Sequence, residues 1–158
     1  PPPEPLLEMP MTSENRGLAR LSLFLNVYGV VSVALFGGLF ALTAIDAPLM
    51  QEGGALPFLR WDPLAKHIGL MTEAVYLVWG LFFFRAARRP LQHLSFIDFT
   101  IWANLAHGLL MVPQAFAIAG FHYKLLTDVA YCLGLSVGLM LLRPSGEERS
   151  PDRGAGAP

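Results

Sequence analysis

The stretch LSLFLNVYGVVSVALFGGLFALTAI, residues 21–45, runs for 25 residues without a charged side chain. A bilayer core about 30 Å thick is crossed by roughly 20 helical residues, so this run can span it with some tilt. A secretory signal peptide is the competing interpretation, because Arg16 and Arg20 precede the run. The apolar region would be too long for a signal peptide, and no clean small-x-small cleavage site follows it. We therefore expect a membrane-spanning helix.

Three further apolar spans follow, at residues 64–84, 95–119 and 125–142. Asp62 and Pro63 suit the N-cap and first turn of the second span. Membrane strands are excluded, because they need only about 10 residues and alternate in polarity. The sequence thus predicts an all-α polytopic membrane protein, a four-transmembrane-helix up-down bundle over residues 18–143. The expected helices are about 18–45, 63–85, 95–119 and 124–142.

The two ends of the chain have a different composition from the four spans. Residues 1–17 begin with a Pro-rich segment and residues 144–158 are polar and rich in Pro and Gly, so both are expected to be disordered. Met9 or Met11 is a candidate true start.

Composition excludes several classes of protein. The 158 residues are 54% hydrophobic and 15% charged, against about 25% charged in soluble domains. The net charge of −1 gives no reason to expect nucleic acid as a partner. A single cysteine, Cys132, rules out an intrachain disulfide and a cysteine-based zinc site. The lipid bilayer is the expected partner.

Basic residues predict the orientation. One side of the membrane would carry eight arginines, and the other would carry Arg60, Lys66 and Lys124. By the positive-inside rule both termini face the cytoplasm, which places a multi-pass protein in a bacterial cytoplasmic (inner) membrane. Trp61 and Tyr123 would then lie in the outer interfacial belt.

Polar residues inside the spans mark where a site would be, since ionisable groups are costly in a bilayer. At 100° per residue, Thr100, Asn104, His107 and Gln114 share one face of the third helix, and Glu73 and Tyr76 share a face of the second. Glu73 and His107 lie at similar depths, so we expect them to face each other near mid-membrane. The pair is either a proton-accepting or cofactor-binding site, or a hydrogen bond that fixes helix register; the second interpretation is preferred.

Other polar residues predict an outer vestibule near the ends of the helices. Its candidates are Asp46, His67, His122 and Asp128. Mixed N/O ligands would suit several metals, but their scatter disfavours a metal site and none is predicted. Asp128 also suits the first turn of the fourth helix, as a carboxylate interacting with the helix dipole. Ser95 and Asp98 match a capping pattern for the third helix.

Three patterns bear on cofactors and partners. Ala103 and His107 have the spacing of a bacteriochlorophyll-binding motif, and His67 with His122 is a weak haem alternative. Neither has supporting context, so no cofactor is predicted; quinone is a further alternative. Gly134 and Gly138 form a small-xxx-small pair suited to close helix contact, either within the chain or in a homo-oligomer or larger membrane complex.

Two segments in the middle of the chain form a recognisable pattern, AVYLVWGLFFFRAARRPLQHLSFIDFTIWANLAHGLLMVPQA and LLTDVAYCLGL. This pattern resembles that of a family of small bacterial four-helix membrane proteins of unknown function. Ala103 and Asn104 depart from the Ser-Ser pair of that family. The resemblance implies the fold class and a bacterial origin, and no activity; a looser likeness to DoxX-like four-helix proteins, some linked to quinone redox systems, is architectural. The matching positions are Tyr76, Gly80, residues 86–90, Phe99, Trp102, His107 and Asp128.

The preferred function is a non-enzymatic accessory or structural membrane component. The alternatives are a membrane redox or cofactor-binding protein and a small proton-linked transporter, each using Glu73 and His107. Four short helices enclose little space, so transport would require an oligomer.

Overall fold

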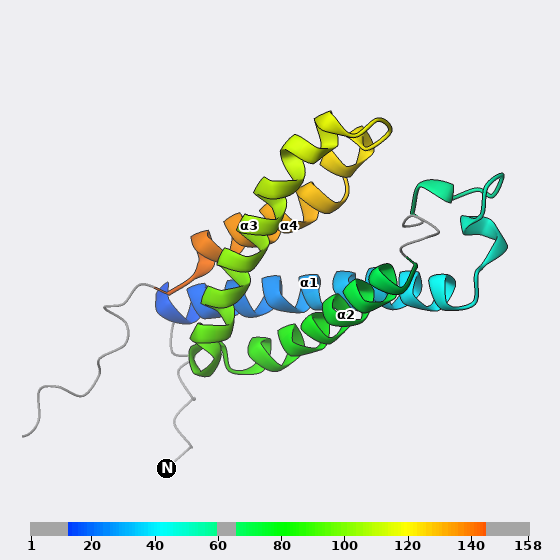
Figure 1. Cartoon of the computed structure of the whole chain (residues 1–158). Helices are drawn as coiled ribbons and strands as arrows, with labels where there is room; N and C mark the ends of the chain where they lie inside the picture. Colours follow the sequence, from blue (N-terminus) through cyan, green and yellow to red (C-terminus); the bar gives the residue numbers. More distant parts are fainter. Residues whose placement is uncertain (1–12, 60–65, 145–158) are drawn as a thin grey trace, which may run out of the picture.

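The computed structural model describes residues 13–59 and 66–144, and within these the chain is helical with no strand. Four long helices follow one another in the chain (Figure 1). The expected all-α fold with four helices is confirmed. The long helices are α1 (Ser13–Ala44), α2 (Lys66–Arg88), α3 (Leu94–Ala117) and α4 (Asp128–Leu142), with short 3-10 helices η1 (Pro48–Met50), η2 (Pro57–Leu59), η4 (Pro90–His93) and η5 (His122–Leu125) between them.

Helix boundaries differ from the expected ones by a few residues. Helix α1 begins at Ser13, before the expected residue 18, because residues 14–20 include good helix formers such as Glu, Leu, Ala and Arg. Helix α4 begins at Asp128 rather than residue 124, because residues 122–125 form the tighter 3-10 turn η5. The expected cap at Asp62 and Pro63, the residues Arg60 and Trp61, and the two expected disordered ends up to residue 12 and from residue 145 lie outside the described residues.

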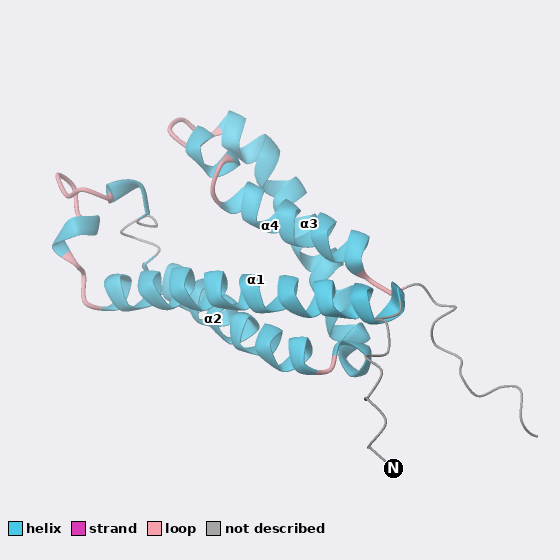
Figure 2. Cartoon of the chain, turned by 180° about the vertical axis from the view of Figure 1, so that it is seen from behind, coloured by secondary structure: helices cyan, strands magenta, loops and turns pink. Residues whose placement is uncertain are grey.

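The four helices form two antiparallel hairpins, α1 with α2 and α3 with α4. Figures 1 and 2 show the hairpins close together at one end and diverging toward the other. The closed end holds the beginning of α1, the connection η4 between α2 and α3, and the end of α4. The open end holds the α1–α2 loop and η5. The helices are therefore arranged as a V of two hairpins rather than as an evenly closed bundle.

The main hydrophobic core occupies the closed end. It combines the first halves of α1 and α3 with the second halves of α2 and α4, and Ser22 adds a 2.6 Å hydrogen bond from its hydroxyl to the Ala87 carbonyl. The small side chains of Ala86 and Ala87 on α2 allow α1 to come close enough for this hydrogen bond. The core residues are Leu21, Leu25, Phe83, Ala86, Ala87, Ile97, Ile101, Leu135 and Leu139.

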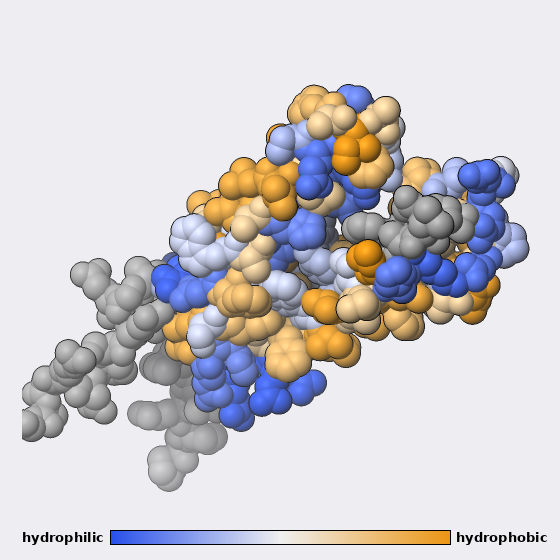
Figure 3. Space-filling view, in the orientation of Figure 1, coloured by the Kyte–Doolittle hydropathy of each residue, from blue (hydrophilic) through white to orange (hydrophobic). Residues whose placement is uncertain are grey.

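Large apolar side chains cover the outside of the molecule. Trp102, Leu126 and Leu141 are between 65% and 86% exposed. Figure 3 shows apolar surface along the helices and hydrophilic surface gathered toward their ends. Each of the four spans Asn15–Ala44, Lys66–Arg88, Pro90–Ala117 and His122–Leu142 is long and apolar enough to cross a membrane. Side chains of this kind are stable against lipid, as expected of a multi-pass membrane protein.

Glycines set the distance between helices at two contacts. A Cβ at Gly80 on α2 would lie 2.6 Å from the Cβ of Ser32 on α1, so only glycine permits this approach. Gly134 and Gly138 on α4 face Tyr28 and Phe24 of α1. The small-xxx-small pair therefore has a contact within the chain.

Candidate functional site

A cavity of about 110 Å³ lies between the two hairpins where they begin to diverge. All four helices contribute to it, and we call it the inter-hairpin cavity. Helix α1 supplies Leu35, Phe36 and Leu39; α2 supplies Thr72, Glu73 and Tyr76; α3 supplies His107 and Met111; and α4 with the residue before it supplies Thr127, Asp128, Tyr131 and Cys132.

Glu73 is the most buried charged side chain of the cavity wall, at 1% exposed. Its Oε1 accepts a hydrogen bond of 3.1 Å from the Thr43 hydroxyl on α1. Its Oε2 is buried and has no hydrogen-bond partner. A buried polar atom left without a partner costs about 1–3 kcal/mol, so the second oxygen keeps an unmet capacity to accept a hydrogen bond.

His107 and Tyr76 connect the hairpins on the wall of the same cavity. The Tyr76 hydroxyl lies 3.2 Å from Nδ1 of His107, and Nε2 of His107 lies 3.0 Å from the Met111 sulfur. One helical turn further along α2, the Trp79 indole N–H donates to the Thr100 hydroxyl at 2.9 Å. The Tyr76–His107 and Trp79–Thr100 hydrogen bonds between α2 and α3 lie where the two hairpins begin to diverge.

Aromatic rings form one side of the cavity. Phe36 of α1 stacks on Tyr76 with 4.6 Å between ring centroids, and Tyr131 of α4 meets both rings edge-on at 5.5 and 6.3 Å. The Tyr131 hydroxyl lies 2.6 Å from the Ser32 hydroxyl, which fixes its direction. The cavity therefore joins acidic groups to an aromatic wall.

The expected pair, Glu73 and His107, lines one cavity but has no direct hydrogen bond. Glu73 is bonded to Thr43, and His107 is bonded to Tyr76, one turn closer to the closed end on α2. The partners differ from the expectation because the hairpins diverge. Glu73 faces α1 within its own hairpin, whereas Tyr76 is near enough to the divergence point to reach α3.

The expected polar seam of α3 is buried at only one end. Thr100 and Asn104 are buried, His107 is half-buried, and Gln114 is exposed. The Asn104 amide donates to the Thr100 carbonyl at 3.0 Å, while its own oxygen is buried without a partner. Gln114 lines a second cavity of about 210 Å³, which shares His107 and Met111 with the first. The polar seam therefore runs along α3 from the hydrophobic core at the closed end to the space between the diverging hairpins.

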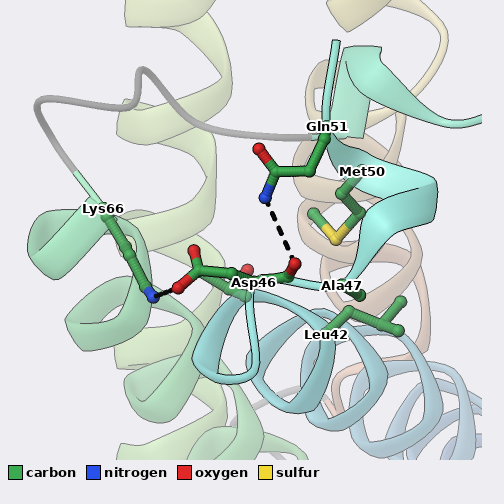
Figure 4. A pocket seen from close by; sticks show the side chains of 7 residues that line it. Leu42, Asp46, Ala47, Met50, Gln51 and Lys66 are labelled. Carbon is green, nitrogen blue, oxygen red and sulfur yellow. Dashed lines mark hydrogen bonds and ion pairs between the residues drawn. The ribbon is translucent and has the colours of Figure 1, made fainter. Parts of the chain in front are cut away.

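The four expected vestibule residues are not gathered at one site. Asp46 forms an ion pair with Lys66 at 2.5 Å and accepts a 3.3 Å hydrogen bond at its carbonyl from Gln51, around a small pocket at the end of α1 (Figure 4). Asp128 lines the inter-hairpin cavity and pairs with Lys124 at 3.2 Å. His67 and His122 are exposed, and the His122 ring meets Phe116. Across residues 13–59 and 66–144, no group of three His, Cys, Asp or Glu side chains is placed to hold a metal ion.

The open end is bridged at its rim. The Tyr123 hydroxyl of η5 donates to the Phe58 carbonyl of η2 at 2.6 Å, and their rings meet edge-on. The long α1–α2 loop thereby reaches the opposite hairpin beyond the inter-hairpin cavity.

Asp98 does not cap α3, contrary to the capping pattern. Helix α3 begins at Leu94, and its N-cap has no side-chain hydrogen bond. The Asp98 carboxylate accepts two hydrogen bonds from the Arg143 guanidinium at the end of α4, the one to Nη2 measuring 2.8 Å. This pairing raises the pKa of Arg143 above its ordinary value. Asp98 thus ties α3 to α4 at the closed end. Asp128 lies in the first turn of α4, as expected, and its carboxylate accepts hydrogen bonds from the side chains of Lys124 and Thr127.

Sequence reasoning missed the contribution of α1 to the site. Ser32 and Thr43 are buried and bind Tyr131 and Glu73. They are 11 residues apart, which is close to three full turns, so they share a helical face. The hydroxyl groups of Ser32 and Thr43 on one face of an uncharged span were the sequence signal that could have identified this contribution.

A family model described as Family of unknown function (DUF6632) matches residues 21–157. The chain belongs to this family. The DUF6632 match begins in α1 and includes every residue that lines the inter-hairpin cavity, a wider range than the two segments that carried the resemblance. Membership of a family of unknown function is confirmed, whereas the likeness to DoxX-like proteins and the bacterial origin stay predictions. No curated protein and no solved structure matches the chain.

Proposed function

We propose that this DUF6632 protein is a non-enzymatic membrane protein that binds a small lipid-soluble ligand in the inter-hairpin cavity. One observation carries the proposal: the carboxylate of Glu73 is buried in the cavity wall and one of its oxygens has no partner. A role in helix register alone would be served better by a group whose hydrogen bonds are complete.

The size of the cavity limits the ligand. An apolar cavity of about 150 Å³ holds benzene, and this one has about 110 Å³, so the part of the ligand inside must be slim. The second cavity, beyond His107 and Met111, adds about 210 Å³ on the adjacent side. A linear molecule with one polar end suits this space better than a ring system.

The arrangement supports binding more than catalysis or cofactor ligation. Both ring nitrogens of His107 are engaged, by Tyr76 and Met111, so metal or pigment ligation would displace one of those contacts. The partners of His107 are a phenol and a thioether, and neither is a carboxylate of the kind that orients the ring of a catalytic histidine. Glu73, which could do so, is bonded to Thr43 instead.

A variant that fills the cavity tests the proposal. Leu39 lines the cavity on α1, whereas Leu23 is 65% exposed on the outside of the same helix. In lipid nanodiscs, slim lipid-soluble compounds should raise the thermal stability of the wild type and of Leu23→Trp. A ligand at 100 times its Kd stabilises by about 2.7 kcal/mol. The same compounds should give no increase in Leu39→Trp. Equal increases in thermal stability for Leu23→Trp and Leu39→Trp, or no increase for any of the three proteins, would exclude the cavity as a binding site.

A second candidate, proton-linked transport by an oligomer, is favoured by Thr43. Its side chain donates to Glu73 and also lines the small pocket that holds Asp46 and Lys66 at the end of α1. Thr43 therefore connects the buried carboxylate with a charged site near the open end. This candidate predicts ligand-dependent proton uptake into vesicles, and Thr43→Val should slow the uptake without weakening ligand binding. Equal proton uptake by the wild type and Thr43→Val would reject it.

We also propose that the chain lies in the cytoplasmic membrane of a bacterium with both termini on the cytoplasmic side. The support is the excess of arginine on the side of the termini. The closed end of the V would then face the cytoplasm, and the cavity would lie in the outer half of the bilayer.

A further inference from the structure

We infer that the ligand of the inter-hairpin cavity is a linear alkylamine in its protonated form, with its ammonium group on Glu73 and its alkyl chain between the hairpins. This inference rests on the proposed function and names the class of ligand. It follows from three properties of the wall: its charges, its free acceptor and its rings.

The charges of the wall are acidic. Glu73 and Asp128 line the cavity, and none of the residues that line it is Lys or Arg. Lys124 pairs with Asp128 from the preceding turn, whereas Glu73 has its hydrogen bond from the Thr43 hydroxyl and no Lys or Arg beside it in the wall. The other titratable groups that line the cavity are Tyr76 on α2, His107 on α3, and Tyr131 and Cys132 on α4; α1 contributes none. A carboxylate ligand would be repelled here, whereas a cation would be attracted.

The acceptors on α2 fit an ammonium group. An –NH₃⁺ group has three donors and no acceptor. Oε2 of Glu73 is a buried acceptor without a partner, and a hydrogen bond between charged groups is roughly twice as strong as a neutral one. The neighbouring Thr72 hydroxyl donates to the Ile68 carbonyl at 2.9 Å, so its oxygen can still accept. An alcohol could make one of these bonds but would leave the carboxylate charge uncompensated.

The rings and the apolar wall fit the rest of the molecule. Phe36, Tyr76 and Tyr131 line one side of the cavity, and aromatic faces attract a desolvated cation. Leu35, Leu39 and Met111 supply an apolar path beside them. The second cavity shares His107 and Met111 with this one and gives an unbranched chain further space beyond Met111.

The test compares hexylamine with ligands of the same chain length, hexanol and hexanoate, on the full chain in nanodiscs. Trp79 stacks on Tyr76 and reports occupancy by its fluorescence once Trp61 and Trp102 are replaced by Phe. Glu73→Gln removes the carboxylate at nearly constant shape. Glu52→Gln makes the same change of charge in the exposed α1–α2 loop and serves as the control. Glu73→Asp keeps the charge, so recovery of binding in this variant would show that the loss in Glu73→Gln comes from the missing charge and not from a defect in folding.

Hexylamine should bind saturably to the wild type and to Glu52→Gln, at least tenfold more tightly than hexanol, and hexanoate should not bind. Glu73→Gln should lose at least tenfold in affinity for hexylamine, and Glu73→Asp should recover part of it. Equal binding of hexylamine by wild type and Glu73→Gln overturns the amine inference. Saturable binding of hexanol as tight as that of hexylamine also overturns it while leaving the proposed function intact. No saturable binding of any of the three overturns both.

Discussion

The Tyr76 hydroxyl on α2 and Nδ1 of His107 on α3 lie 3.2 Å apart and join the two hairpins at the point where they diverge. On one side of this bond the chain packs into the hydrophobic core of the closed end. On the other side lies the inter-hairpin cavity. The bond thus sets where the core stops and the cavity begins.

Removing this bond should weaken the contact between the hairpins. Tyr76→Phe should lower the free energy of unfolding by about 0.6 kcal/mol, the average for such bonds between membrane helices, with about 1.7 as an upper value. Reversible unfolding of the folded protein in mixed micelles measures the change. A double-mutant cycle with His107→Gln isolates the pair. A coupling energy of zero would show that the two side chains contribute independently.

Gly80 should be the glycine least tolerant of substitution in the α1–α2 contact. A Cβ there would meet the Ser32 Cβ at 2.6 Å, so Gly80→Ala must push the two helices apart, at a cost of about 1–3 kcal/mol. Gly38 on α1 has no atom within 4 Å of its Cβ position, and Gly38→Ala should leave stability unchanged or slightly raised. Thermal unfolding of both variants checks this. Equal losses would refute the close approach at Gly80.

The Asp98–Arg143 pair should stabilise the closed end modestly and without pH dependence near neutrality. Both side chains are about one-third exposed, so Asp98→Asn should cost about 0.2–1 kcal/mol. Asp98 raises the pKa of Arg143, which means that the guanidinium contributes its stability at all pH values below its ordinary pKa and loses it only as the pH rises through the raised value. The difference in stability between wild type and Asp98→Asn should therefore be constant from about pH 7 to about pH 10. A difference that declines over this range would contradict the pairing.

The proposed orientation predicts which loops an impermeant thiol reagent reaches. Cys132 is buried and is replaced by Ala to remove the background. In intact cells, Glu52→Cys in the α1–α2 loop should react, and Gln92→Cys in η4 should react only after permeabilisation. Both positions are exposed, so accessibility across the membrane decides the outcome. The reverse pattern would invert the topology.

The four spans were predictable because their signals are long and local. Residues 21–45 carry no charge over 25 positions, and the end of α2 is marked by arginines and Pro90. The 3-10 turn η5 was not predictable, because residues 122–127 contain no proline or glycine that would mark a separate turn before the fourth span. The V shape depends on contacts between helices, which no single span encodes.

The members of the candidate site on α2 and α3 were predictable, whereas their hydrogen-bond partners were not. Depth along each helix placed Glu73 and His107 at one level, and both line the cavity. Their partners depend on the angle between the hairpins, which turns Glu73 toward Thr43 and brings Tyr76 to His107. Asp98 looked like a cap from local spacing, whereas its partner Arg143 is 45 residues away in the chain.

The central claim is that the free oxygen of Glu73 holds the ammonium group of a ligand, and solid-state NMR tests it most directly. Protein with carboxyl-¹³C glutamate is reconstituted in lipid with ¹⁵N-hexylamine, and the ¹³C–¹⁵N dipolar coupling is measured beside Glu73→Gln. The account predicts a dephased glutamate carboxyl signal that is present in the wild type and absent from the variant. A wild-type spectrum without dephasing, or the same dephased signal in Glu73→Gln, would contradict it.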